Sequence, residues 1–280
     1  MQERWCTGQV LLLVPRRLAA RAAAEYMARQ IGEEPGATIG YQTRLDSRAG
    51  KDTRVIAMTH GVYLSRIQAD PELAGVSAVL FDEVHERSLD NDLALALTLD
   101  AAAALREDLR VVAMSATLDG ERFARLLGDP PRIESEGKSH PLTIQHVGRD
   151  PAARIEPQVA VACRRALTDH EGSLLAFLPG VAEIERTAEA LGPLPPGVVL
   201  HRLHGAVDPR DQRSALAPPA PGTRKLVLAT SIAETSVTLE DVRIVVDSGL
   251  ARRPRYDRGA GLTRLATERA SRAATTQRAG

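Results

Sequence analysis

The feature that most constrains the fold is a regular alternation of short apolar runs with longer segments rich in alanine and charged residues. Such apolar runs are typical of buried parallel strands, and the segments between them are typical of helices that cover a sheet. The sequence therefore predicts an α/β fold. The clearest expected strands are Val10–Val14, Val55–Met58, Ala78–Phe81, Val111–Met114, Leu174–Leu178, Val198–Leu200, Lys225–Ala229 and Ile244–Val246.

The eight expected strands form two groups of four, which predicts two sheets and two domains. A chain of 280 residues is long enough for two domains of ordinary size. The polar stretch between Gly128 and Pro141 separates the groups. We expect a first domain over residues 1–139 and a second over 140–280; the alternative is a long surface loop within one sheet. Near the end, Arg252 to Glu268 alternates polar and apolar residues around a turn, which predicts a β-hairpin.

The charge balance gives no bulk argument for or against a polyanionic partner. Lysine plus arginine number 36, aspartate plus glutamate also number 36, and the formal net charge is zero. Any surface that binds nucleic acid must therefore be local. Arginine dominates the basic residues, which suits forked contacts to phosphate, but a biased genomic base composition produces the same enrichment.

Cysteine usage and hydropathy indicate the compartment. Cys6 and Cys163 lie far apart and match no metal-ligand spacing, so we expect a reduced pair rather than a disulfide or a zinc site. No apolar stretch approaches about 18 residues, and residues 1–9 carry charges where a secretory signal would be apolar. We expect a soluble, cytoplasmic protein without a membrane partner.

An acidic pair, Asp82 and Glu83, comes directly after the expected strand Ala78–Phe81. In an open α/β sheet, ligands bind at the carboxyl ends of the strands, so these acids are placed to act on one. An aspartate there can hold the water shell of a magnesium ion, and the next acid can orient and polarise an attacking water, as phosphoryl transfer requires. Taken alone, the pair is also compatible with an ordinary turn or helix cap.

Three other expected strands are followed by side chains suited to hydrogen bonding. Ser115-Ala116-Thr117 offers two small hydroxyls that can report on a neighbouring loop, and Arg16-Arg17 offers two forks for a phosphate backbone. The segment from Thr230 to Ser236 carries five hydroxyl or carboxyl groups. The structural alternative is a Ser/Thr cap for the first segment and a solvated arginine pair for the second, whereas the third carries more polar groups than a turn requires.

These pieces, in this order, resemble the DEAH-box group of superfamily 2 helicases over essentially the whole chain. Each motif is unspecific by itself, whereas their joint order is specific. The matching segments are Pro15–Arg17 (motif Ia), Thr59–Gly61 (Ib), Asp82–Arg87 (II), Ser115–Thr117 (III), Leu178–Gly180 with Glu183–Glu185 (IV), Thr230–Ser236 (V) and the run from Gln277 to Gly280 (the start of VI).

The resemblance implies two RecA-like domains, each a mostly parallel sheet covered by helices. It implies an ATP-dependent helicase that uses ATP and Mg²⁺ and couples hydrolysis to movement along single-stranded nucleic acid, RNA or DNA. Asp82 and Glu83 would serve the magnesium and the water, and His85 would link motif II to the second domain. Ser115 and Thr117 would couple hydrolysis to strand movement.

Further roles follow from the same resemblance. Thr238 and Glu240 would reach the nucleotide, Gln277 would act at the catalytic centre, and Tyr26 takes the place of an arginine that stacks on adenine in relatives. The hairpin from Arg252 to Glu268 resembles an element that helps to separate strands. The residues expected to contact the nucleic-acid backbone are Arg16, Arg17, Thr59, Gly180, Thr230 and Ser236.

Two departures from the family pattern bear on activity. No glycine-rich phosphate loop of the pattern G-x-x-x-x-G-K-[ST] occurs, and the sequence stops at Gly280, before the arginines that would reach the γ-phosphate. We therefore expect both domains to be incomplete and the chain alone to be inactive, since an arginine finger by itself is worth about 10³–10⁵ in rate. The alternative is a catalytically dead module that binds nucleic acid or a protein; the genomic DNA upstream of Met1 distinguishes the two.

Overall fold

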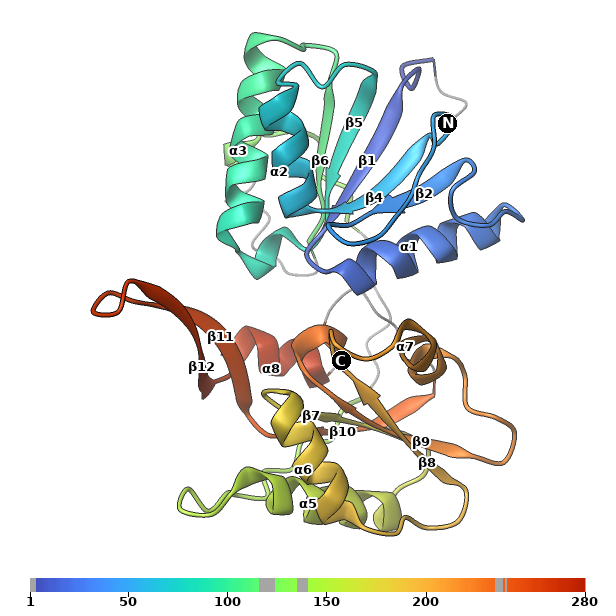
Figure 1. Cartoon of the computed structure of the whole chain (residues 1–280), viewed down its shortest axis with the longest axis vertical. Helices are drawn as coiled ribbons and strands as arrows, with labels where there is room; N and C mark the ends of the chain where they lie inside the picture. Colours follow the sequence, from blue (N-terminus) through green and yellow to red (C-terminus); the bar gives the residue numbers. More distant parts are fainter. Residues whose placement is uncertain (1–3, 116–123, 135–140, 235–238, 240, 280) are drawn as a thin grey trace. The chain divides into compact units, whose positions relative to one another are not determined.

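A computed structural model describes residues 4–115, 124–134, 141–234, 239 and 241–279. The chain divides into two compact units, Met1–Lys138 and Ser139–Gly280, shown in Figure 1. Each unit is described by itself.

The first unit is built on a six-stranded sheet. Its strands are β1 (Gln9–Val14), β2 (Ile39–Gln42), β3 (Ser47–Arg48), β4 (Val55–Thr59), β5 (Val76–Phe81) and β6 (Arg110–Ala113). They lie in the order β3-β2-β4-β1-β5-β6, and every neighbouring pair is parallel except β2 with β3. The carboxyl ends of β4, β1, β5 and β6 therefore share one edge of the sheet.

Helices cover both faces of this sheet (Figure 1). Helix α1 (Arg17–Gln30) lies on one face, and α2 (His60–Ala69) and α3 (Leu89–Ala104) lie on the other. Tyr63 of α2 packs edge-on against Phe81 of β5, with the ring centroids 6.2 Å apart. The buried side chains of α1 are all small, which lets the helix approach the sheet closely; they are Ala19, Ala20, Ala24 and Ala28.

The second unit contains a four-stranded parallel sheet. Its strands are β7 (Ser173–Phe177), β8 (Val198–Leu203), β9 (Arg224–Ala229) and β10 (Val242–Asp247), in the order β10-β7-β9-β8. Helices α5 (Ile155–Asp169) and α6 (Val181–Leu191) pack on one face through a shared apolar core. Helix α7 (Pro209–Leu216) contacts β8, and α8 (Arg272–Ala279) contacts β10.

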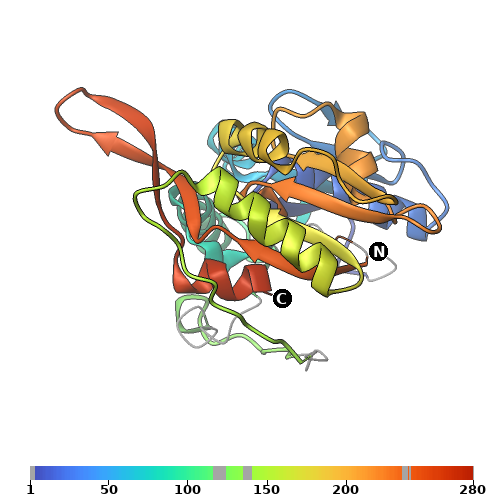
Figure 2. The ribbon, with the colours of Figure 1, turned by 90° about the horizontal axis from the view of Figure 1, so that it is seen from below.

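A long antiparallel hairpin follows the sheet of the second unit. It consists of β11 (Leu250–Asp257) and β12 (Leu262–Arg269). Figures 1 and 2 both show it extending away from the four-stranded sheet. Most of its side chains are exposed, including the apolar Tyr256, Leu262 and Leu265.

The predicted α/β class with mostly parallel sheets is confirmed, and so is the hairpin. The prediction missed β2 and β3 because neither contains an apolar run: β2 reads Ile-Gly-Tyr-Gln, and β3 is two exposed residues long. Gly40 in β2 makes β3 possible, because a Cβ there would stand 2.2 Å from the carbonyl oxygen of Arg48. Both cysteines are buried and free, and none of the described helices is long and apolar enough to cross a membrane.

Several basic side chains bind backbone carbonyls instead of facing solvent. Arg224 donates to three carbonyls, those of Leu167, His170 and Gly172. Lys225, on the adjacent position of β9, is buried, and its Nζ donates to the carbonyls of Ser214 (2.6 Å), Ala215 (3.2 Å) and Ala217 at the carboxyl end of α7. Part of the basic content therefore stabilises the fold, because these carbonyls have no helical partner.

We expect Lys225→Met to destabilise the second unit by about 1–3 kcal/mol, because three carbonyls would lose their donor. The measurement is hydrogen exchange of β9 amides, which follows this unit alone in a chain of two units. Lys51→Met, at an exposed position of the first unit, is the matched control and should leave β9 protection unchanged. Equal protection in both variants would contradict the capping role of Lys225.

Candidate functional site

Polar residues gather at the carboxyl edge of the six-stranded sheet. Arg16 follows β1, Thr59 ends β4, Asp82 follows β5 and Ser115 lies just beyond β6. Because β4, β1, β5 and β6 are adjacent and parallel, these four positions line one edge. This is the edge at which open α/β sheets bind ligands.

The backbone from Asp82 to Arg87 is locally strained. The Asp82 amide donates to the Leu13 carbonyl (2.9 Å), which ties the start of the segment to the end of β1. Glu83 then has φ 53° and Arg87 has φ 47°, both in the left-handed region that residues other than glycine rarely adopt. Strain of this kind is typical of sites where the exact direction of a side chain matters.

The acidic pair is electrostatically unusual. Burial raises the pKa of Asp82, and the negative charge of Glu86 adds to the effect. Burial, together with the charges of Asp82 and Glu86, raises the pKa of Glu83 to about 7. A carboxylate with a pKa near neutrality is suited to accept a proton in a reaction at physiological pH.

His85 joins this pair to the end of β6. It lies in the short 3₁₀ turn Val84–Glu86, and its Nδ1 is 3.4 Å from Glu83 Oε2 and 3.4 Å from Ser115 Oγ. Glu83, His85 and Ser115 therefore form one cluster over β5 and β6. That His85 links motif II to the second domain stays a prediction, and Thr117 lies outside the described residues.

The two arginines after β1 have different surroundings. The Nη2 atom of Arg16 lies 3.8 Å from Glu86 Oε2, and both side chains are about three-quarters buried. Arg17, the first residue of α1, is exposed. Arg16 thus connects the end of β1 to the strained segment, whereas Arg17 is open to a ligand.

Thr59 and Tyr26 occupy different parts of the first unit. Thr59 is half-buried at the start of α2, on the same sheet edge as the acidic pair. Tyr26 is 63% exposed and lies nine residues beyond Arg17, which corresponds to about 14 Å along α1. The structure does not bring Tyr26 into the cluster at the sheet edge.

Predicted residues of the second unit also follow strands. Gly180 is the N-cap of α6 beyond β7, Thr230 is the N-cap of a 3₁₀ turn directly after β9, and Gln277 lies half-buried in α8. Because β7 and β9 are adjacent and parallel, Gly180 and Thr230 lie at the same edge of their sheet. Ser236, Thr238 and Glu240 lie outside the described residues.

Arg278 has no role predicted from the sequence, yet the structure buries it in the second unit. Its side chain is buried, and it contacts Glu234 (2.5 Å), Asp247 (2.6 Å) and the Leu250 carbonyl (3.3 Å). Its guanidinium lies 4.9 Å from the centroid of the Phe177 ring. Arg278 therefore joins the segment after β9, the end of β10 and the start of β11. The sequence contains many acidic residues, and no local pattern indicates which of them pair with Arg278.

The acidic edge suits a magnesium ion shared with phosphates. Mg²⁺ is usually bound through one or two carboxylates together with waters and phosphate oxygens, and Asp82 and Glu83 supply carboxylates of this kind. Within the described residues, no group of three or more His, Cys, Asp or Glu forms a metal cage. The donor set therefore fits a metal that arrives with a nucleotide.

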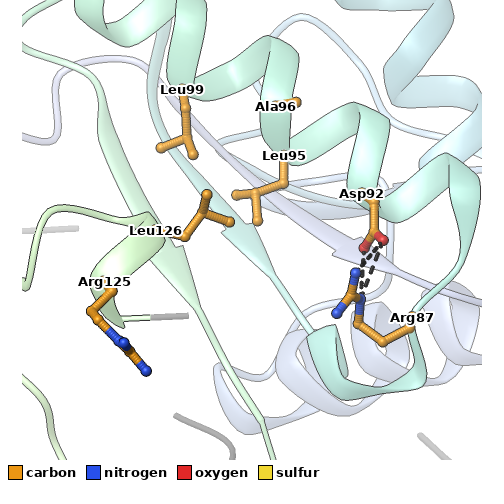
Figure 3. Close-up of a pocket in the computed structure, with 7 residues that line it drawn as sticks. All are labelled: Arg87, Asp92, Leu95, Ala96, Leu99, Arg125 and Leu126. Carbon is orange, nitrogen blue, oxygen red and sulfur yellow. Dashed lines mark hydrogen bonds and ion pairs between the residues drawn. The ribbon is translucent and has the colours of Figure 1, made fainter. Parts of the chain in front are cut away.

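A pocket of about 660 Å³ lies on the α3 side of the first unit (Figure 3). Arg87 stands at one end, where it makes a forked ion pair with Asp92 (2.9 Å), and Leu95, Leu99 and Leu126 form apolar walls. Neither Asp82 nor Glu83 lines it. The pocket is therefore distinct from the acidic edge.

The first unit thus presents an acidic pair and a hydroxyl at the carboxyl ends of adjacent parallel strands, the edge at which open α/β sheets bind ligands. Residues 158–280 match the helicase conserved C-terminal domain. The ATP-dependent RNA helicase HrpB of Escherichia coli (strain K12) is 48% identical over 274 residues, which make up 98% of this chain and 34% of that protein. Over 98% of its length the chain is therefore similar to a member of the DEAH/RHA helicase family.

A further relative and a solved structure show similarity over the same length of chain. The ATP-dependent RNA helicase DHX30 of Homo sapiens is 35% identical over 298 residues, covering 97% of this chain and 25% of that protein. The crystal structure of Escherichia coli DEAH/RHA helicase HrpB matches with a TM-score of 0.92 at 48% identity, covering 98% of this chain and 35% of that one. The chain spans about a third or less of the length of these relatives.

The raised pKa of Glu83 predicts a pH-dependent stability. The folded chain keeps the Glu83 proton up to about pH 7, whereas the unfolded chain loses it near the ordinary pKa of 4.5, so ionisation costs stability as pH rises through this window. We expect Glu83→Gln to be more stable than the parent chain by about 1–2 kcal/mol at pH 8, after discounting for partial solvation, and by less at pH 5.

Thermal melting in EDTA at both pH values tests this. Glu72→Gln, at an exposed position of the same unit, is the control and should show no such pH-dependent gain. A Glu83→Gln variant that is no more stable than the parent chain at pH 8 would contradict the raised pKa.

Proposed function

We propose that the chain carries the first and second RecA-like domains, residues 1–139 and 140–280, of an ATP-dependent RNA helicase that couples hydrolysis to movement along single-stranded nucleic acid. The observation that supports this most is the cluster of Asp82, Glu83, His85 and Ser115 at the carboxyl edge of the first sheet. Phosphoryl transfer to water needs one acid for the metal and one for the attacking water, and this cluster offers both, with His85 in contact with Glu83 and Ser115.

In this proposal each residue of the cluster has one task. Asp82 would hold the water shell of Mg²⁺, and the ion when bound would supply positive charge that offsets the charge of the phosphates. Glu83 orients the attacking water and accepts its proton, and its raised pKa makes the carboxylate a stronger base than a solvated one. His85 and Ser115 report the state of that carboxylate to the end of β6 through their 3.4 Å contacts.

Nucleic-acid contacts are proposed from hydrogen-bond donors at the carboxyl edge of each sheet. Arg17 is open to a phosphate, and Thr59 and Thr230 place small hydroxyls beside helical or 3₁₀ N-termini. RNA is favoured over DNA because the relatives named above are RNA helicases. The roles of Gly180, Ser236, Thr238, Glu240, Gln277 and Tyr26 rest on the family resemblance.

We expect the chain by itself to be a binding module without turnover. The sequence has no G-x-x-x-x-G-K-[ST] loop; Gly137-Lys138-Ser139 gives only its last three letters, with Arg132 where the first glycine would stand, and residues 135–140 lie outside the described part of the chain. Without that loop the phosphates lack their usual cradle of amides and lysine. On this ground we expect ATP hydrolysis by the chain alone to be near background.

The catalytic assignment is tested in the complete protein that contains this chain. Glu83→Gln should abolish RNA-stimulated ATP turnover, because the glutamine cannot accept a proton from the water, while ATP binding persists. Steady-state phosphate release and nucleotide binding are the measurements, with Glu72→Gln as the control. Turnover that survives Glu83→Gln would remove Glu83 from the mechanism.

The surface is tested with the chain itself, by measuring binding to single-stranded RNA as a function of salt. We expect affinity to fall as salt rises, and Arg17→Ala to weaken binding and reduce the log–log slope by about 0.7, the value for one phosphate contact on a single strand. Arg29→Ala, an exposed arginine in the last turn of the same helix, is the matched control. Binding that ignores salt, or equal effects of the two variants, would contradict the proposed contact.

A further inference from the structure

The β11–β12 hairpin buries almost no apolar side chains, so polar contacts hold its root. The amide of Ala270 donates to the carbonyl of Gly249 (2.9 Å) and closes the root. Beyond it, Ala251 is the only buried residue among the described residues of the two strands. The direction in which the hairpin leaves the unit must therefore be set by polar contacts near its root.

Arg252 makes the contacts that reach from the hairpin to helix α6. Its Nη2 lies 3.2 Å from Glu183 Oε1 on α6, and its Nε lies 3.4 Å from Thr267 Oγ1 on the opposite strand. Arg252 and Thr267 are direct partners in the β11–β12 register. The guanidinium of this β11 residue thus contacts both β12 and the first turn of α6.

Gly180 provides the space that this guanidinium occupies. A Cβ at position 180 would stand 2.5 Å from Arg252 Nη1 and 2.8 Å from Arg252 Cζ, well inside ordinary contact distance. The φ of Gly180 is −165°, which any residue adopts, so its backbone conformation does not require glycine. The close approach of Arg252 does.

Glu183 is the acceptor that fixes the arginine. Its side chain is 13% exposed, and its Oε1 also accepts from Arg186 Nη2 (3.1 Å), which in turn pairs with the buried Glu156 of α5 (2.5 Å). Alternating charges therefore run from β11 through α6 to α5. Removal of the Glu183 charge would free Arg252 on the hairpin and leave the ion pair between Arg186 and Glu156 in place.

We infer that Gly180, Glu183 and Arg252 form a latch that sets the direction of the β11–β12 hairpin relative to α6. Glu183 and Arg252 are positioning residues that act on strand separation through the hairpin. The functional part of this inference rests on the proposed helicase activity, in which the hairpin helps to separate strands. The structural part, a hairpin oriented by the latch, does not depend on that activity.

The structural part is tested on this chain with a pair of spin labels, one at Ala260 in the hairpin turn and one at the exposed Glu189 of α6. We expect a narrow distance distribution in the parent chain and a broad one in Glu183→Gln and in Gly180→Ala. The alanine would displace the side-chain ends of Arg252 and Glu183 rather than backbone, so Gly180→Ala should still fold. Equal thermal melting of the variants confirms this.

Glu185→Gln is the matched control for the label experiment. Glu185 lies on the same helix and pairs with Arg202 of β8 at 2.9 Å, so the substitution removes an ion pair without touching the hairpin. Its distance distribution should remain narrow. Distributions that stay narrow in both Glu183→Gln and Gly180→Ala would overturn the latch.

The functional part is tested in the complete protein by measuring duplex unwinding and RNA-stimulated ATP hydrolysis on the same preparations. Glu183→Gln should reduce the duplex unwound per ATP by about 2- to 10-fold while the ATPase rate is unchanged, and Glu185→Gln should change neither. Glu183→Gln with Arg252→Ala together should lose no more unwinding than the worse single variant, because the pair acts as one device.

The outcomes separate the two proposals. Additive losses of unwinding in the double variant, or a parallel fall in ATPase and unwinding, would overturn the positioning role. A complete protein that unwinds no RNA would instead refute the proposed function, and the label distances would still decide whether the latch exists.

Discussion

Parallel pairing of β4, β1, β5 and β6 is the constraint on which the candidate site depends. Strands that run the same way deliver the residues after them to one edge, so Arg16, Thr59, Asp82 and Ser115 lie along that edge although residues on adjacent strands are 33 to 66 positions apart in the sequence. Antiparallel pairing would send half of them to the opposite edge. Helices on both faces make this arrangement stable, because they bury the strands that would otherwise expose two apolar surfaces.

At that edge, burial and neighbouring negative charges oppose the ionisation of Asp82 and Glu83, while backbone hydrogen bonds hold both residues in place. Asp82 and Glu83 are neighbours in the chain, and Glu86 adds a third negative charge nearby. Arg16 opposes this effect, since its positive charge lowers the pKa of Glu83. The segment keeps its left-handed Glu83 only because the end of β1 and the 3₁₀ turn hold both of its sides. A site of this kind stores free energy in order to keep one carboxylate basic.

Much of the fold could be predicted from the sequence because a buried strand appears in it as a short apolar run. Val76–Phe81 is buried along most of its length and reads as an apolar run, so both the strand and the acids after it were predicted. Ile39–Gln42 is also largely buried, but a glycine and a glutamine interrupt the run, and its place in the sheet comes from pairing with β4. The positions of Asp82, Glu83 and Ser115 followed from strand ends, whereas the ion pairs of Arg278 and Arg252 did not, because their partners lie 31 to 69 residues away with no local signal.

The shared oxygen of Glu183 has a consequence for how the hairpin can move. Oε1 accepts from both Arg252 and Arg186, so departure of Arg252 leaves the carboxylate still paired with a guanidinium on its own helix. Breaking a buried ion pair is usually expensive because one charge is stranded without a counter-ion. Here no charge is stranded, and Arg252 is one-third exposed and can be hydrated as it leaves. The contact between the hairpin and α6 can therefore break and re-form without loosening the packing of α5 against α6.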